Sequence, residues 1–180
     1  MAHAPGQRSG TVWLVGMMGS GKTSVGHRLA ERLGRRFVDT DREVEMAARA
    51  TVKEIFEREG EAGFRTRERA AIEAVAGSGA VVSLGGGAVA QPGVAETLAA
   101  SGTIVYLRAR PETLLRRVGA ARSRPLLRGL SRPARLERLR GLLAERQAHY
   151  ERAALVVDTD DANVEQVADA IVRRLEGDAT

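Results

Sequence analysis

The sequence predicts a single α/β domain in which helices cover both faces of a parallel sheet. Short apolar runs alternate along the chain with longer segments of helical periodicity, and this alternation is typical of parallel sheets. The 180 residues suit one domain and suffice to bury a full hydrophobic core. No repeat or linker divides the chain, so we expect one folded domain over residues 11–176, after a flexible tail over residues 1–10.

Three strands are expected in the first half of the chain, separated by helices. The strands are short apolar runs that end at glycine or at acidic residues: Thr11 to Gly16, Arg36 to Asp39 and Ala80 to Leu84. Between the first two, Lys22 to Leu33 has apolar residues at helical spacing. Thr51 and Glu54 form a capping-box pattern for a helix through Phe56. A longer, highly charged helix is expected from Glu61 to Ala76.

The second half of the chain continues the alternation. The expected elements are a helix near Gly93 to Ala100, a strand from Thr103 to Leu107, a helix from Pro111 to Val118, a helix from Arg132 to Arg152, a strand from Ala154 to Val157 and a helix from Asn163 to Leu175. Proline suits the first turn of a helix, as at Pro111. The segment Gly119 to Leu130 breaks the pattern with Arg, Gly and Pro, and such a segment is usually functional or mobile.

The composition excludes several classes of protein. The chain has no cysteine, which excludes disulfides and thiolate metal sites. Its histidines, His3, His27 and His149, are scattered, which argues against a zinc cluster. No apolar run approaches the length of a membrane span, and the first ten residues lack the apolar core of a signal peptide. We therefore expect a cytoplasmic protein with no membrane partner.

The chain is basic, with a net charge of +5. Such a balance suits nucleic acid, or small anions such as ATP and carboxylic acids. The arginines are spread over several predicted helices, and one Trp, two Tyr and three Phe offer few rings for stacking bases. We therefore expect small anionic ligands and no nucleic acid.

A phosphate-binding pattern follows the first predicted strand. Residues 16–23, GMMGSGKT, fit G-x-x-x-x-G-K-[ST] fully and precede a predicted helix. Glycines let backbone N–H groups curl around phosphate oxygens, and the start of the helix adds its positive dipole end. Lys22 supplies a charge between the β- and γ-phosphates, and Thr23 offers a hydroxyl to Mg²⁺. The pattern predicts a nucleotide-phosphate site and leaves open whether the protein is a kinase, another NTPase or an adaptor.

An acidic pair, Asp39 and Asp41, lies at the predicted carboxyl end of the second strand. Ligands of open α/β sheets bind at that edge. One carboxylate there can hold the Mg²⁺ shell, and the other can orient or deprotonate an attacking hydroxyl. The alternative is that Asp41 is only the N-cap of a helix over Arg42 to Arg49. The position opposite the phosphate loop favours the functional interpretation.

Glycines follow the third predicted strand at Gly85, Gly86 and Gly87. They let another molecule approach the backbone closely, although a plain flexible turn is the alternative.

Six segments carry a resemblance to a known family. In order along the chain, they are GMMGSGKT, FVDTD, IFEREGEAGFRTRE, VVSLGGGAV, RPLL and ERQAHY. Together these segments resemble the shikimate kinase family, and the resemblance runs from about Thr11 to about Leu175. The phosphate loop is generic, whereas D-T-D, F-R-x-x-E and L-G-G-G in this order discriminate between families.

The resemblance implies a fold and a reaction. The fold would be a single-domain P-loop α/β/α architecture of the nucleoside monophosphate kinase group, with a five-stranded parallel sheet in the order 2-3-1-4-5. A mobile lid would lie at about residues 119–131. MgATP would phosphorylate the 3-hydroxyl of shikimate on the route to chorismate and the aromatic amino acids. We expect shikimate and ATP as the partners, and a monomer.

The resemblance also implies roles for individual residues. ATP would be bound by Gly19, Ser20, Gly21, Lys22, Thr23, Ser24, Arg117 near the adenine, and Arg124 of the lid. Shikimate would be bound by Asp41, Arg65, Gly85, Gly86, Gly87 and Arg146, with Phe56 and Phe64 on its apolar side. The catalytic residues would be Lys22, Asp41 and Arg124, and the metal would be held by Thr23 directly and by Asp39 through water. An Asn-Pro that some members carry near the adenine reads Asn163-Val164 here.

The residue chemistry agrees with these roles, but alternatives stay open. A carboxylate substrate calls for guanidinium forks, because arginine gives two parallel donors that lysine cannot. On the residues alone, however, Arg65 and Arg146 read as solvated surface arginines, and Phe56 and Phe64 as core residues. A kinase for another acceptor, such as gluconate or a nucleoside monophosphate, remains a rival. A nucleotide- or RNA-binding module without catalysis is the rival from another class.

Overall fold

The computed structural model describes residues 10–119 and 125–177 of the chain. Five parallel strands form one sheet in the order β2-β3-β1-β4-β5, which confirms the expected sheet. The strands are β1 (Thr11–Val15), β2 (Phe37–Asp39), β3 (Val81–Ser83), β4 (Gly102–Arg108) and β5 (Leu155–Asp158). The tail expected over residues 1–10 lies, apart from Gly10, outside the described residues.

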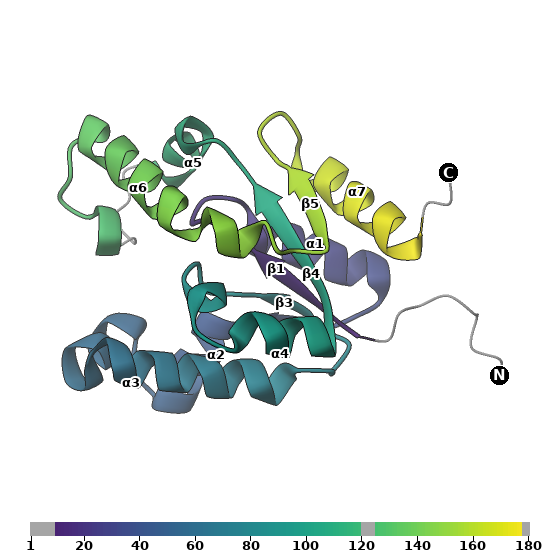
Figure 1. Cartoon of the computed structure of the whole chain (residues 1–180), viewed down its shortest axis with the longest axis horizontal. Coiled ribbons are helices and arrows are strands. Elements are labelled where there is room, and N and C mark those ends of the chain that lie inside the picture. The colour runs from purple at the N-terminus through teal and green to yellow at the C-terminus, as the bar shows by residue number, and fades with distance from the viewer. Residues whose placement is uncertain (1–9, 120–124, 178–180) are drawn as a thin grey trace.

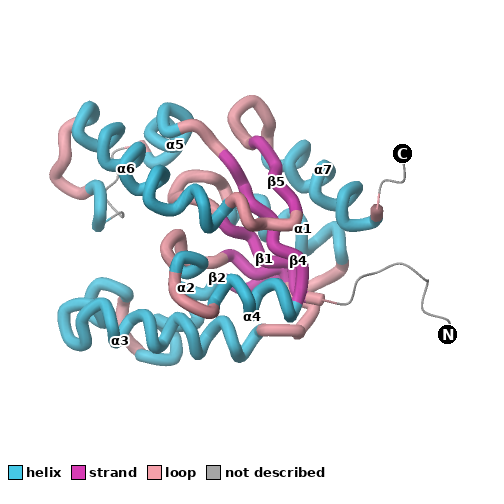
Figure 2. The backbone as a smooth tube through the Cα atoms, in the orientation of Figure 1, coloured by secondary structure: helices cyan, strands magenta, loops and turns pink. Residues whose placement is uncertain are grey.

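Helices surround the sheet on both faces (Figures 1 and 2). The α-helices are α1 (Lys22–Leu33), α2 (Thr40–Ala48), α3 (Val52–Val75), α4 (Val94–Ser101), α5 (Pro111–Val118), α6 (Arg132–Tyr150) and α7 (Val164–Glu176). Two short 3-10 helices, η1 (Ala88–Ala90) and η2 (Pro125–Leu127), were not expected from the sequence.

The central strand β1 contributes side chains to two separate hydrophobic cores, one on each face of the sheet. All of its residues are buried, and their side chains alternate between the faces of the sheet. Trp13 and Val15 point to the core that α3, α4, α5 and α6 complete. Val12 and Leu14 point to the core that α1 and α7 complete. Burial on both faces explains why this strand is a continuous apolar run in the sequence.

Of the acidic pair, Asp39 alone caps α2, which the sequence did not reveal. The interpretation of Asp41 as the N-cap is wrong, because α2 already begins at Thr40. The cap is Asp39, whose Oδ1 accepts hydrogen bonds from the backbone N–H groups of Asp41 at 3.1 Å and Arg42 at 3.4 Å. Capping by Asp39 leaves the carboxylate of Asp41 out of the cap, at the carboxyl edge of the sheet.

The two helices expected between Thr51 and Ala76 are joined end to end in α3. The capping box is confirmed: the Thr51 hydroxyl accepts from the N–H of Glu54, whose carboxylate accepts from the N–H of Thr51. Gly60 lies inside α3 with non-helical dihedral angles and turns its direction. With α2, the first part of α3 forms a small cluster of its own around Val44 and Ile55. Among the described residues, no helix combines the length and the apolar character that a membrane span needs.

Candidate active site

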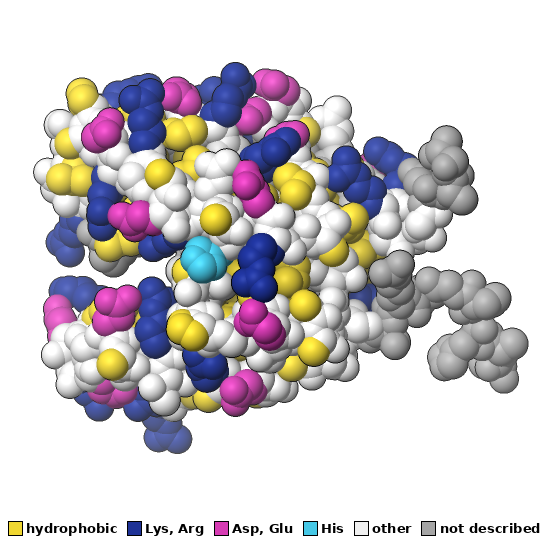
Figure 3. Space-filling model, in the orientation of Figure 1, with side chains coloured by type: hydrophobic (Ala, Val, Ile, Leu, Met, Phe, Trp, Pro, Cys, Tyr) yellow, Lys and Arg dark blue, Asp and Glu magenta, His cyan; other side chains and the backbone are white. Residues whose placement is uncertain are grey.

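A large cleft lies at the carboxyl edge of the sheet. Its volume is about 1320 Å³, more than one drug-sized ligand occupies. It opens between α3 and α6, at the left of the space-filling view (Figure 3). Every residue of the predicted site that the structure describes lines this cleft: Gly19, Ser20, Gly21, Lys22, Thr23, Ser24, Asp39, Asp41, Arg65, Gly85, Gly86, Gly87, Arg117 and Arg146. The cleft has room for two ligands side by side.

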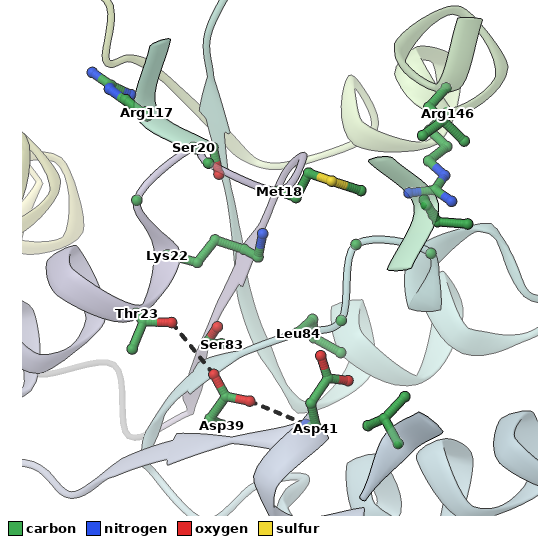
Figure 4. Close-up of a pocket in the computed structure, with 18 of the residues that line it drawn as sticks. Met18, Ser20, Lys22, Thr23, Asp39, Asp41, Ser83, Leu84, Arg117 and Arg146 are labelled. Atoms are coloured by element: carbon green, nitrogen blue, oxygen red, sulfur yellow. Dashed lines mark hydrogen bonds between the residues drawn. The ribbon is translucent and has the colours of Figure 1, made fainter. Parts of the chain in front are cut away.

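The phosphate loop connects β1 to α1. Gly21 is the N-cap of α1 with φ 96°, a left-handed conformation that favours glycine. Lys22 donates from Nζ to the carbonyl oxygens of Gly16 at 2.8 Å and Met17 at 3.0 Å. These bonds fold the ammonium back over the loop, at the rim of the cleft (Figure 4). A helix N-terminus and an ammonium at one place form a site for an anion such as a phosphate.

Thr23 and Asp39 meet beside the phosphate loop. The Thr23 hydroxyl donates to Asp39 Oδ2 at 3.5 Å, while Oδ1 of the same carboxylate caps α2 (Figure 4). Both residues offer oxygen donors, which hard cations such as Mg²⁺ prefer. The described residues contain no cluster of three or more His, Cys, Asp or Glu that could hold a metal by itself. A cation here would therefore need further oxygen ligands, such as phosphates and water.

Asp41 points into the cleft from the first turn of α2 (Figure 4). Burial raises the pKa of its carboxyl group to about 6, and the nearby charges of Glu68 and Asp39 act in the same direction. The positive charge of Lys22 opposes them. A carboxylate with a raised pKa is a better proton acceptor than an ordinary aspartate.

Glycines form the floor of the cleft, and at Gly85 and Gly87 the neighbouring side chains leave no room for a Cβ atom. Thr40 links α2 to the end of β3 and to this floor. Its hydroxyl donates to Ser83 O at 3.3 Å and accepts from the N–H of Gly85 at 3.2 Å. A Cβ atom on Gly85 would lie 2.4 Å from Glu68 Oε1 and 2.8 Å from Asp41 Oδ1. Any side chain at Gly85 would therefore displace the two carboxylates.

Arg65 is held in the cleft by contacts on three sides. Its Nη1 donates to Glu68 Oε2 at 2.7 Å, and Nη2 donates to Glu61 Oε1 at 3.4 Å. Its guanidinium lies over the Phe64 ring, 5.4 Å from the centroid. A Cβ atom on Gly87 would lie 2.8 Å from Nη2. Arg65 is therefore not the free surface arginine that the charged helix suggested.

Glu68 is a site residue that the sequence reasoning missed. Its side chain is fully buried, with Oε2 bonded to Arg65 and to Gln91, the latter at 2.6 Å. Its other oxygen, Oε1, has no hydrogen-bond partner among the described residues. Burial raises the pKa of its carboxyl group, while the hydrogen bond and charge of Arg65 oppose the shift. Glu68 is the last residue of the F-R-x-x-E motif, but the resemblance assigned it no role. On the residues alone, its three-residue spacing from Arg65 looks like an ordinary surface pair on a helix.

Arg146 enters the cleft from α6, opposite Arg65. Its Nη1 lies 3.4 Å from the place that a Cβ atom of Gly86 would take. One turn later, the buried Tyr150 hydroxyl donates to Gly86 O and contacts Met17 Sδ at 3.7 Å. Burial raises the pKa of Tyr150 to about 12. Tyr150, which the sequence reasoning also passed over, thus fixes α6 against both the glycine floor and the phosphate loop.

The other end of the cleft is formed by α5 and the loop after β5. Arg117 donates from Nη1 to the Thr159 hydroxyl at 2.8 Å and from Nη2 to the Thr159 carbonyl. The backbone N–H of Arg110 donates to Asp160 Oδ1 at 3.0 Å. Both ends of α5 therefore hold the loop that continues to Asn163, the N-cap of α7. The resemblance places the adenine of ATP near Arg117, and this role stays a prediction.

The predicted lid is described only in part. Arg124, which we expected to be the lid arginine, lies outside the described residues. After it, η2 buries Leu127 in the core and leaves Leu126 exposed at the cleft.

The arrangement joins two kinds of binding chemistry in one cleft. A phosphate loop lies at one end, and two arginines that can bind an acid flank the glycine floor. A carboxylate with a raised pKa lies between them. Such an arrangement can hold a nucleotide beside a small hydroxy acid and accept the proton of a hydroxyl group.

Comparisons with known proteins agree with this geometry. The family model described as shikimate kinase matches residues 18–176. A shikimate kinase from Symbiobacterium thermophilum is 48% identical over 167 residues, which cover 91% of this chain and 94% of that protein.

Solved structures give the same result. The structure of a shikimate kinase from Acinetobacter baumannii in complex with shikimate has a TM-score of 0.87 and 38% identity, and the match covers 97% of each chain. The shikimate kinase from Aquifex aeolicus has a TM-score of 0.80 and 32% identity, covering 94% of this chain and 98% of that one.

Proposed function

The chain belongs to the shikimate kinase family, and we propose that it transfers the γ-phosphoryl group of ATP to the 3-hydroxyl of shikimate. The observation that carries this proposal is the single cleft that joins the phosphate loop to Arg65 and Arg146 across a floor of glycines. The products are ADP and shikimate 3-phosphate. The reaction is a step of aromatic amino-acid biosynthesis.

The phosphate loop binds the triphosphate of ATP. Backbone N–H groups of residues 19–24 surround the β-phosphate at the start of α1. The Lys22 ammonium, held at the rim by carbonyl oxygens, turns to the bridging and γ-phosphate oxygens. Arg117 and the loop it holds lie beside the adenine at the far end of the cleft.

The acid is held at the opposite end of the cleft. Arg65 and Arg146 bind its carboxylate from two sides, since each guanidinium offers paired donors in a fixed plane. Glu68 keeps Arg65 in place. Phe56 and Phe64, whose ring centroids are 4.7 Å apart, form the apolar wall beside the ring of the acid. Because two cations fix one end of the acid, its hydroxyls face Asp41.

Asp41 binds and deprotonates the reacting hydroxyl. As the 3-hydroxyl oxygen forms its bond to the γ-phosphorus, the bond from that phosphorus to the oxygen bridging to the β-phosphate breaks. The proton of the hydroxyl passes to the Asp41 carboxylate, and ADP is the leaving group. Burial and two neighbouring carboxylates favour the protonated form of Asp41, which suits this role.

Mg²⁺ fits the donors beside the phosphate loop. The Thr23 hydroxyl would hold it directly, and Asp39 would hold it through water. The chemistry that the ion supplies is neutralisation of charge on the β- and γ-phosphate oxygens. Arg124, by analogy with the family, closes on the transferring phosphate from the lid.

The remaining features of the proposal concern the whole protein. We also propose that the protein acts as a monomer, because one chain supplies both the phosphate loop and the two arginines of the cleft. We also propose a cytoplasmic location, where ATP is available.

A coupled assay of ADP release tests the function. MgATP is supplied with shikimate and, in parallel reactions, with quinate, gluconate, AMP or water as the acceptor. We expect ADP release that depends on shikimate, with every other acceptor at least about 100-fold slower, because each leaves polar groups of the site unpaired. Turnover on gluconate or AMP without turnover on shikimate would contradict the proposal.

A further inference from the structure

Helix α3 turns a corner at Gly60, and the backbone of Gly60, an ion pair and a close contact at Gly63 together fix the angle of this corner. Gly60 has φ 69° and ψ −174°, a region that only glycine occupies readily. The corner divides α3 into a first part, residues 52–59, and a second part, residues 61–75. The corner separates two sets of residues that line the same cleft, and α3 itself lies at the lower left of Figure 1.

An ion pair bridges the corner. Arg67 donates from Nε to Glu59 Oε2 at 2.8 Å and from Nη2 to Glu59 Oε1 at 2.9 Å. Eight residues along a straight helix span about 12 Å, so this two-point contact exists only because the helix turns. The contact lowers the pKa of Glu59. Both side chains are only part-exposed, Glu59 at 25% and Arg67 at 39%.

Gly63 completes the corner. A Cβ atom at Gly63 would lie 2.5 Å from the Cβ of Glu59, whereas Cβ atoms four residues apart in a helix are about 5–6 Å apart. The first part of α3 therefore folds so closely over the second that only glycine fits. The ion pair and this contact hold the same angle between the two parts.

The corner determines the shape of the wall that faces the acid. Phe56 belongs to the first part, and Phe64 and Arg65 belong to the second. The two rings contact each other across the corner with centroids 4.7 Å apart, and Arg65 lies over the Phe64 ring. A change in the angle would therefore move Phe56 away from Phe64 and reshape the side of the cleft where Arg65 lies.

We propose that Glu59 and Arg67 are positioning residues for the acid substrate: their ion pair fixes the angle of α3 and thereby the affinity for shikimate. Neither residue lines the cleft, so the pair acts through Phe56 and Arg65. The proposal rests on the proposed function, because it concerns the acid end of that same cleft. The phosphate loop belongs to a different part of the chain, so ATP binding is not involved.

Kinetics of matched variants test the pair. Arg67→Met removes the charge and keeps the apolar stem, and Glu59→Gln removes the partner charge. We expect each variant to raise the KM for shikimate about three- to tenfold, because a 1 Å displacement of positioning groups has large effects. The KM for ATP should stay within about twofold. The double variant should be no worse than the worse single variant, because both remove the same interaction. Arg67→Lys should recover part of the affinity.

Arg152→Met is the control. It breaks an ion pair to Glu96 of 3.1 Å that is exposed and remote from the cleft, and it should change neither KM. Thermal unfolding of each variant shows that it is folded. A KM for shikimate within twofold of wild type in both single variants, or equal rises in both KM values, would overturn the inference. A wild-type enzyme without shikimate-dependent turnover would instead overturn the proposed function, and this inference with it, before any variant is measured.

Discussion

Arg65 donates a hydrogen bond from Nη1 to Oε2 of Glu68 at 2.7 Å, and the carboxylate that receives it is fully buried. The arginine itself is 26% exposed at the cleft. A buried carboxylate that also accepts from Gln91 is a rigid anchor, whereas a solvated one is not. The guanidinium is therefore oriented before any ligand binds.

Removal of this anchor should weaken binding of the acid. We expect Glu68→Ala to raise the KM for shikimate at least about tenfold, because Arg65 loses a charge-assisted bond worth roughly 1.5–3 kcal/mol. Steady-state kinetics with each substrate varied in turn measure the change. Glu61→Ala is the matched control: Glu61 contacts the same guanidinium at 3.4 Å but is 72% exposed, so its effect should stay below about threefold. Equal effects of the two variants would contradict the anchoring role.

The arginines should act on the acid and not on the nucleotide. Arg146→Lys keeps the positive charge but loses the paired donors, so the KM for shikimate should rise about 10- to 100-fold. Arg65→Ala should do the same, and the KM for ATP should change little in both. Titration calorimetry measures the affinity for ATP. A fall in that affinity in either variant would show that the arginine binds the nucleotide and not the acid.

Lys22 should act on turnover. Lys22→Ala removes the positive charge from the phosphate loop, and we expect kcat to fall at least about 100-fold. Single-turnover measurements at saturating ATP separate this loss from a loss of binding. A kcat near that of wild type would refute the assignment of the phosphate loop.

Asp41 gives the reaction a dependence on pH. The carboxylate must be ionised to accept the proton, and burial raises its pKa to about 6. The rate at limiting shikimate should therefore be constant above this value and fall about tenfold for each unit below it. A pH–rate profile measures the midpoint. Glu68→Gln should move the midpoint to lower pH, since the Glu68 charge is one of the causes that raise the pKa of Asp41. A profile without an acidic limb between pH 5 and 7 would contradict the role of Asp41 as base.

The lid arginine should affect the chemical step. Arg124→Ala should lower kcat with little change in the KM for shikimate, because the charge that it neutralises develops only in the transition state. Comparison of kcat with both KM values is the measurement. An unchanged kcat would exclude a role in the lid.

Much of the fold could be predicted because each signal is local. The apolar run of β1, the capping pair of Thr51 and Glu54, and the glycine that begins α1 act through neighbours in sequence. The order of the strands came from the resemblance to a family, because the periodicity of a strand does not name its neighbours.

The features that escaped prediction depend on contacts between distant segments. Glu68 looks like one charge among many on a helix, and its burial arises only when Gln91 and Gly85 pack against it. Tyr150 likewise finds its partner, Gly86, 64 residues earlier in the chain. The choice of Asp39 over Asp41 as the cap of α2 depends on a boundary shift of two residues, which patterns do not resolve.

Identification of the product tests the central claim most directly. The enzyme is incubated with MgATP and shikimate, and the products are followed by phosphorus NMR together with a measurement of ADP. The account predicts one new phosphomonoester, formed in equal amount to ADP, whose phosphorus couples to the proton on carbon 3 of shikimate. ADP accompanied only by inorganic phosphate, or an ester at another hydroxyl, would contradict it.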